Sequence, residues 1–261
     1  MSQHYRSRIY FGKIFTLASY FGKICMNEVR VSGDGLIELQ ASDDGLTEFR
    51  ALGDDLAKVR ASGEVLAKVK ASSGGPTKVR TSCGDLVKVK VSGGGPAKVR
   101  DSGDGLAKVR ASGGVLAKVK ASSGGPTNVR TSCGDLVKVK VSGGGPAKVR
   151  ASGDGLAKVR ASGGVLAKVK ASSGGSTKVR TSCGDLAKVK ASGGGPAKVR
   201  ASGDGLAKAR ASDGGPVKAK ALGGGPAKVR ASGGGLAKAR TLSGGPAKVR
   251  DSSGGPAKLR R

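Results

Sequence analysis

A ten-residue repeat governs this chain from residue 31 to residue 260, where 23 copies follow one another without interruption. The copy at 151–160 has the sequence Ala-Ser-Gly-Asp-Gly-Leu-Ala-Lys-Val-Arg. Because every copy has ten residues, the last digit of a residue number gives its position in the repeat. A repeat of this kind constrains the chain to a local structure that ten residues can complete and the next ten can copy.

A helix does not meet this constraint, whereas a strand does. Ten residues at 100° per residue leave each copy rotated by about 80° from the last, so no helical face persists. Most copies also contain two or three glycines, each of which costs a helix about 1 kcal/mol relative to alanine. In a strand, Ala157, Val159 and Ala161 would face one side, and Lys158 and Arg160 the other.

The first half of each repeat predicts a turn. Gly-Asp-Gly or Gly-Gly-Gly at positions three to five is typical of tight turns. Proline stands at position six in nine copies, which is the start of the expected strand, where proline is tolerated. The ordered fold is therefore all-β, with short strands at positions six to ten. Two arrangements remain open: a hairpin meander, and a β-solenoid with two copies per coil.

Two properties of the repeat oppose order. The apolar face consists of alanine and valine, which bury little area compared with the entropy lost on ordering. The other face would bring lysine and arginine opposite one another on neighbouring strands, and like charges in that position are destabilising. The chain contains no tryptophan, three tyrosines and four phenylalanines. We therefore expect the low-complexity repeats to be largely disordered, with a tendency toward β structure.

Charge divides the sequence into three segments. Residues 1–27 form a basic aromatic leader with no acidic side chain, and residues 28–70 are degenerate acidic repeats with a net charge of −3. Residues 71–261 are basic glycine-rich repeats with a net charge of +29. A second period of 50 runs through this last segment, where 121–150 differs from 71–100 only by Asn128 in place of Lys78.

The leader predicts a short N-terminal amphipathic helix. Tyr-Phe-Gly-Lys-Ile occurs at 10–14 and again at 20–24, and the helical wheel separates Lys13 and Lys23 from a face of aromatic and aliphatic residues. This pattern has two interpretations that the sequence leaves open. One is a targeting peptide for an organelle, and the other is contact of residues 9–24 with a membrane surface. Without targeting, we expect an intracellular protein.

Residue types that support catalysis or metal binding are scarce. His4 is the single histidine, and no serine has a base nearby in the sequence to activate it. Cys83, Cys133 and Cys183 recur at intervals of 50 residues, an odd number of repeats, so in a two-copy coil they would not stack on one side. We interpret them as free thiols multiplied by duplication. The sequence predicts no enzyme, no cofactor and no metal site.

Regularly spaced basic pairs are the functional signal. Lysine at position eight and arginine or lysine at position ten could lie along a row of phosphates and release counterions, without reading base sequence. The basic repeats have no aromatic residues on which bases could stack. We predict generic, non-specific binding of nucleic acid or another polyanion by a set of twelve cations: Lys88, Lys90, Lys98, Arg100, Lys108, Arg110, Lys138, Lys140, Lys158, Arg160, Lys198 and Arg200.

Two alternatives remain beside polyanion binding. The first is a structural protein whose strands self-associate into a β-repeat assembly. The second is a translated minisatellite with no selected function, because the 50-residue blocks are nearly identical rather than diversified.

Overall fold

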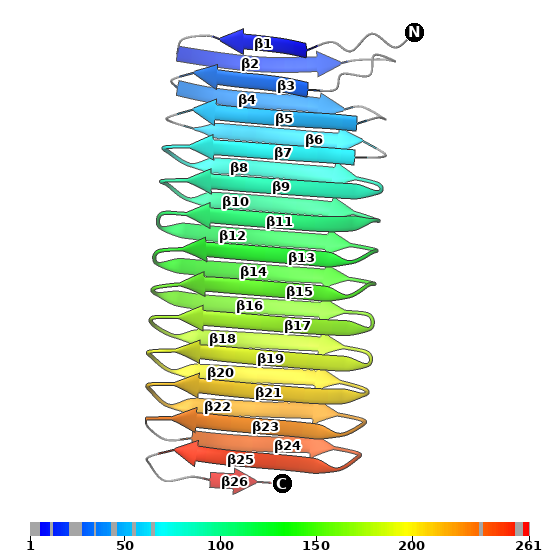
Figure 1. Cartoon of the computed structure of the whole chain (residues 1–261), viewed down its shortest axis with the longest axis vertical. Helices are drawn as coiled ribbons and strands as arrows, with labels where there is room; N and C mark the ends of the chain where they lie inside the picture. The colour runs from blue at the N-terminus through cyan, green and yellow to red at the C-terminus, as the bar shows by residue number, and fades with distance from the viewer. Residues whose placement is uncertain are drawn as a thin grey trace.

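The protein forms a flattened coil, in which consecutive strands run back and forth and build two packed sheets (Figure 1). In the computed structural model, the described residues are 6–10, 13–20, 28–33, 35–42, 46–53, 56–63, 66–234, 237–253 and 258–260. Consecutive strands alternate between the sheets, and each sheet has 13 parallel strands. This arrangement is a β-solenoid in which two repeats make one coil.

Odd-numbered strands form one sheet and even-numbered strands the other. The odd sheet contains β1 (Arg6–Tyr10), β3 (Glu28–Gly33), β5 (Leu46–Gly53), β7 (Leu66–Ser73), β9 (Leu86–Gly93), β11 (Leu106–Gly113), β13 (Thr127–Cys133), β15 (Ala147–Gly153), β17 (Leu166–Ser173), β19 (Leu186–Gly193), β21 (Leu206–Asp213), β23 (Ala227–Gly233) and β25 (Ala247–Ser253). The even sheet contains β2 (Lys13–Tyr20), β4 (Gly35–Ser42), β6 (Ala57–Gly63), β8 (Thr77–Cys83), β10 (Ala97–Gly103), β12 (Leu116–Ser123), β14 (Leu136–Gly143), β16 (Leu156–Gly163), β18 (Thr177–Cys183), β20 (Ala197–Gly203), β22 (Val217–Gly223), β24 (Ala237–Ser243) and β26 (Lys258–Arg260).

Strand pairing follows a register of twenty residues throughout the repeats. Val99 on β10 pairs with Val79 on β8 and with Val119 on β12. Each residue therefore lies beside the residue at the same repeat position, two copies away. Parallel strands lie about 4.8 Å apart, so each coil adds about 4.8 Å to the long axis of the solenoid.

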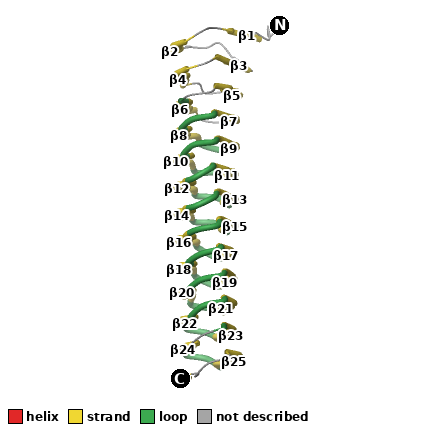
Figure 2. The backbone as a smooth tube through the Cα atoms, turned by 90° about the vertical axis from the view of Figure 1, so that its left-hand side faces the viewer, coloured by secondary structure: helices red, strands yellow, loops and turns green. Residues whose placement is uncertain are grey.

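The core is the narrow space between the two sheets (Figure 2). It is filled by repeat positions seven, nine and one. On β16, Ala157 is 0% exposed, Val159 is 1% and Ala161 is 3%, while Arg160 between them faces solvent. The expected alternation of buried and exposed residues is confirmed, and the strands from β5 to β25 continue beyond position ten to position three of the next copy.

The parallel pairing decides between the sequence-based alternatives. The two-copy solenoid is confirmed, and the hairpin meander is wrong because every described strand pair is parallel. The expectation of a largely disordered chain is also wrong. That expectation rested on the small area of alanine and valine and on repulsion between neighbouring cations, whereas in the structure the second sheet closes over the alanines and valines and buries them almost completely. The small free energy gained by burying each alanine or valine is then repeated at each interface between coils, as in other repeat proteins.

The expected N-terminal helix is likewise wrong. The structure places β1 and β2 within that leader, and they pair in parallel with β3 and β4. Phe15 lies beside Ile37, and Leu17 beside Leu39. The leader strands contain aromatic and β-branched residues, and their pairs are 22 residues apart, so they join the stack with an offset of two residues from the register of the repeats. Such residues favour strands when a neighbouring strand supplies the pairing.

The turns stack from coil to coil as closely as the strands do. The backbone N–H of Leu106 donates to the carbonyl of Asp85 at 2.7 Å, and the N–H of Asp104 donates to the carbonyl of Gly84 at 3.1 Å. A Cβ atom at Gly105 would lie 1.6 Å from the Asp85 carbonyl oxygen. Glycine is therefore required here because the adjacent turn occupies the space of a side chain. None of the described residues belongs to a helix with the length and apolarity to span a membrane.

We predict that Val139→Ala destabilises the solenoid by about 2–3 kcal/mol. Val139 on β14 is 2% exposed and packs in the core, and its truncation removes two methyl-sized groups and leaves a cavity. The adjacent Lys138 faces solvent and serves as the matched control, since Lys138→Ala removes no core contact. Urea unfolding followed by circular dichroism measures both variants. Equal urea midpoints for the two variants would contradict the burial of Val139 in the core.

Candidate polyanion-binding faces

Lysine and arginine side chains cover the outer surface of both sheets. Repeat positions eight and ten point away from the core because they alternate with the buried positions seven, nine and one. We call the outer surface of the odd sheet the odd face and that of the even sheet the even face. Each strand from β6 to β25 contributes two cations to its face, except β13, which has Asn128 at position eight.

The twenty-residue register arranges these cations in columns. On the even face, Lys98 lies beside Lys78 and Lys118, and Arg100 beside Arg80 and Lys120. Neighbours in a column are about 4.8 Å apart at the backbone, and the columns of positions eight and ten are about 6.6 Å apart. Each face therefore presents two parallel columns that follow the long axis of the solenoid.

The twelve cations expected to bind a polyanion are divided between the two faces. The odd face holds four of them, on β9 and β11: Lys88, Lys90, Lys108 and Arg110. The even face holds the other eight, on β10, β14, β16 and β20: Lys98, Arg100, Lys138, Lys140, Lys158, Arg160, Lys198 and Arg200. The fold thus brings together residues 20 apart and separates those 10 apart, such as Lys88 and Lys98.

The expected set omits cations that the structure places between its members. Lys118 and Lys120 on β12 lie between the β10 and β14 pairs, and the three strands together with β16 form one groove. This groove has a volume of about 480 Å³ and is lined by eight lysine and arginine side chains. A similar groove of about 490 Å³ crosses β19 to β25 on the odd face and has eight cations as well. The cations of both grooves recur every twenty residues, so the two-repeat coil is the sequence signal that identifies them.

A third groove lies beside the position-ten column of the odd face. It has a volume of about 350 Å³ and runs between arginine side chains and the serine residues at position two. Arg110, Arg130 and Arg150 stack on three successive coils along this groove. Arginine forks and hydroxyl groups are donors that suit phosphate or sulfate oxygens.

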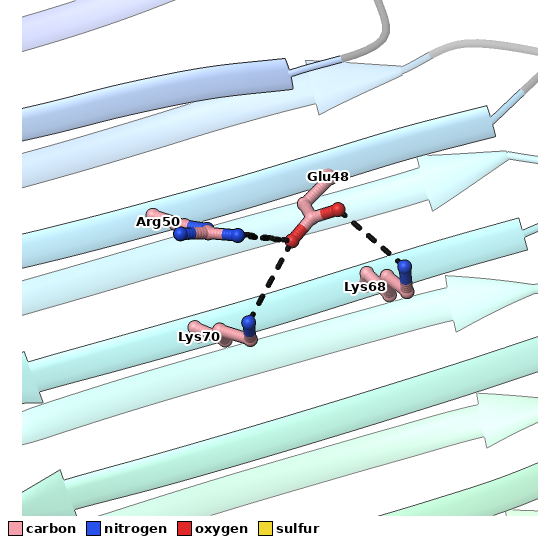
Figure 3. Close-up of polar contacts among 4 residues, drawn as sticks. All are labelled: Glu48, Arg50, Lys68 and Lys70. Atoms are coloured by element: carbon pink, nitrogen blue, oxygen red, sulfur yellow. Dashed lines mark hydrogen bonds and ion pairs between the residues drawn. The ribbon is translucent and has the colours of Figure 1, made fainter.

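Glutamate ends the cation columns near the N-terminal end of both faces. Glu48 on β5 forms ion pairs with Arg50 at 3.3 Å, Lys68 at 3.5 Å and Lys70 at 3.8 Å (Figure 3). On the even face, Glu38 on β4 lies 3.7 Å from Lys58. Both glutamates occupy position eight, where later copies have lysine.

Beyond these glutamates the columns carry no compensating charge. Within the described stretch 71–234, no lysine or arginine lies within ion-pair distance of a carboxylate. The repulsion between neighbouring cations is therefore relieved only by solvent and counterions. Columns of this kind attract anions and lose that attraction as salt increases.

The acidic residues of this stretch lie mainly at the turns, along the edges of the solenoid. Asp85 and Asp104 are exposed on successive turns of one edge. Asp135 and Asp154 repeat this pair on the other edge, because the 50-residue block contains an odd number of repeats. Carboxylates and cations thus occupy different surfaces of the molecule.

The repeated cysteines follow the same alternation, as expected from their spacing. Cys83 ends β8 and Cys183 ends β18 on the even sheet, while Cys133 ends β13 on the odd sheet. Cys133 and Cys183 are free thiols, and burial raises the pKa of both above the usual value. They are therefore held in the thiol form, which is neither the nucleophilic nor the metal-binding form.

Two carboxyl groups are buried in the core of the solenoid. The hydroxyl of Thr81 donates to Oδ1 of Asp101 at 2.6 Å, and Asp101 is 4% exposed. Burial raises its pKa to about 6, although the hydrogen bond from Thr81 lowers it. Burial also raises the pKa of Asp213 to about 6. Among the described side chains, no three metal-ligating groups gather at one place.

Comparison of the chain with models of protein families, with curated proteins and with solved structures finds no match. The case for a function therefore rests on the geometry of the faces alone.

We predict that Asp101→Ala stabilises the protein at pH 8 by about 2–3 kcal/mol and has little effect at pH 4. The folded-state pKa of Asp101 exceeds the unfolded value, so well below pH 4 both states are protonated and no penalty exists, and at pH 4 the penalty is still small. As the pH rises from about 4 to 6, the unfolded state ionises first and stability falls by this amount.

Urea unfolding at the two pH values measures the effect. The equivalent positions in the next two 50-residue blocks are Ala151 and Ala201, which are both buried in the core, so the fold accepts alanine here. Ser102→Ala, one residue away and exposed, is the control for an unrelated substitution. A pH-independent effect of Asp101→Ala would contradict the burial of an ionisable group at this position.

Proposed function

We propose that this protein is a non-enzymatic polyanion-binding rod that holds nucleic acid along the cation columns of its faces. The observation that carries the proposal is the uncompensated alignment of lysine and arginine on successive coils, from Lys78 to Arg230. The rod binds through the phosphate backbone and does not distinguish base sequences, because contacts to phosphate oxygens carry no sequence information.

The spacing of charges supports nucleic acid as the ligand. Two cations per coil give each face about one positive charge for every 2.4 Å of its axis. Duplex DNA has about one negative charge for every 1.7 Å of its axis. The columns are also linear and border grooves, which suits a linear polyanion that lies along the solenoid.

We predict a steep salt dependence for this binding. A duplex that engages the eight cations of one groove should give a slope near −7 in a plot of log K against log salt concentration. The affinity should then fall by about 10⁴-fold between 50 and 200 mM salt. Fluorescence anisotropy of a labelled 30-base-pair duplex, titrated with the full chain, measures the slope.

Two duplexes of equal length and unrelated sequence provide the control, and their affinities should agree within a factor of about three. A neutral dextran of similar size should not compete. No binding at 50 mM salt would overturn the proposed function, and so would an affinity that is unchanged at 200 mM salt.

The ordered solenoid also favours a second candidate, a structural protein that assembles with other copies. The observation is the uniform register of the parallel sheets, since each described coil pairs with its neighbour through the same backbone ladder. Sedimentation of the full chain over a hundredfold concentration range tests it. A mass that stays monomeric throughout would remove this candidate and leave polyanion binding unaffected.

A further inference from the structure

We infer that the protein bridges two separate nucleic acid molecules, one on each face. This inference rests on the proposed function and adds a consequence of the solenoid topology. Because consecutive repeats alternate between sheets, the basic pairs at Lys88 and Lys98 point in opposite directions although they are ten residues apart. The chain therefore distributes its cations evenly over two back-to-back surfaces.

The two faces are nearly equal in charge. The even face has 18 cations from Lys78 on β8 to Arg240 on β24, and the odd face has 17 from Lys88 on β9 to Arg250 on β25, the difference being Asn128. Both faces contain a groove with eight cations, of about 480 and 490 Å³. A ligand that binds one face therefore finds an equivalent site on the other.

The core keeps the two sites independent. Packed sheets lie about 10 Å apart, and here the space between them is filled with alanine and valine. A cation on one face cannot reach a ligand on the other, because its side chain points away from the core. The sandwich is also rigid along its length, since each described strand is paired with neighbours in its sheet.

The edges oppose the wrapping of one nucleic acid around both faces. Repeat positions three to six, which comprise the turns and the strand ends beside them, contain no lysine or arginine between residues 73 and 246. Exposed carboxylates stand there instead, at Asp85 and Asp104 on one edge and at Asp135 and Asp154 on the other. A phosphate backbone that crosses an edge would lose its cations and meet like charge. Two molecules, one per face, avoid this cost.

A two-colour capture experiment tests the inference with the full chain at 50 mM salt. A 30-base-pair duplex is fixed to beads and saturated with protein, free protein is washed away, and a second, fluorescent duplex is added. We expect the wild-type protein to retain the fluorescent duplex, and beads without protein to retain none.

Two matched variants separate binding from bridging. One replaces the 18 cations of the even face by glutamine, and the other replaces the 17 of the odd face. Glutamine removes the charge but keeps a polar, unbranched side chain that forms compatible ladders in parallel sheets, and circular dichroism checks that each variant retains its strands. Each variant should still bind the bead-bound duplex, and its retention of the second duplex should fall at least tenfold.

The outcomes distinguish this inference from the proposed function. Wild-type protein that binds the first duplex but retains no second duplex overturns bridging and leaves nucleic acid binding intact. One-face variants that retain the second duplex as well as the wild type also overturn it, because one face or self-association would then suffice. Absence of binding to the first duplex overturns both. Vesicles with phosphatidylserine form the last arm, and their clustering without duplex retention would assign the faces to lipid surfaces instead.

Discussion

Parallel pairing between residues twenty apart is the interaction on which the whole structure depends. Within the repeats it places each paired residue beside its equivalent two repeats away, so Val99 lies beside Val119 and Lys98 beside Lys118. The core and the charged faces have the same origin in this register. A change of register by one residue would turn the cations inward and the valines outward, so a single register determines both the core and the charged faces.

The packing of the small core side chains stabilises the solenoid, and the repulsion between the repeated cations opposes it. Alanine and valine allow the two sheets to enclose a dry layer, in which Val139 and Ala157 are almost fully buried. The cations on the outside oppose this packing, since two unit charges about 4.8 Å apart repel by about 1 kcal/mol in water before salt screens them. A bound polyanion would replace that repulsion with attraction and so stabilise the solenoid as well.

The duplicated block has five repeats whereas one coil has two, and this difference places the repeated cysteines and aspartates alternately on opposite sides of the solenoid. Each duplicated block begins on the opposite sheet from the one before it, so Cys133 and Cys183 end strands of different sheets. The aspartate pairs alternate between the edges for the same reason. A block with an even number of repeats would have collected each of these groups on one side, and the two edges would then differ in charge.

The sequence by itself determined the strand and turn halves of the repeat, the alternation of Val159 with Lys158 and Arg160, and the exclusion of a helix by the ten-residue period. It also indicated that lysine and arginine at positions eight and ten are exposed, because they alternate with small apolar residues, although the expected set of twelve named only part of each column. Only the tertiary structure decided that the repeats are ordered, that the leader forms strands and that the cations group on two faces. Those properties depend on which strands become neighbours: the second sheet closes the core, and the coil of twenty residues, rather than the repeat of ten, sets which side chains meet.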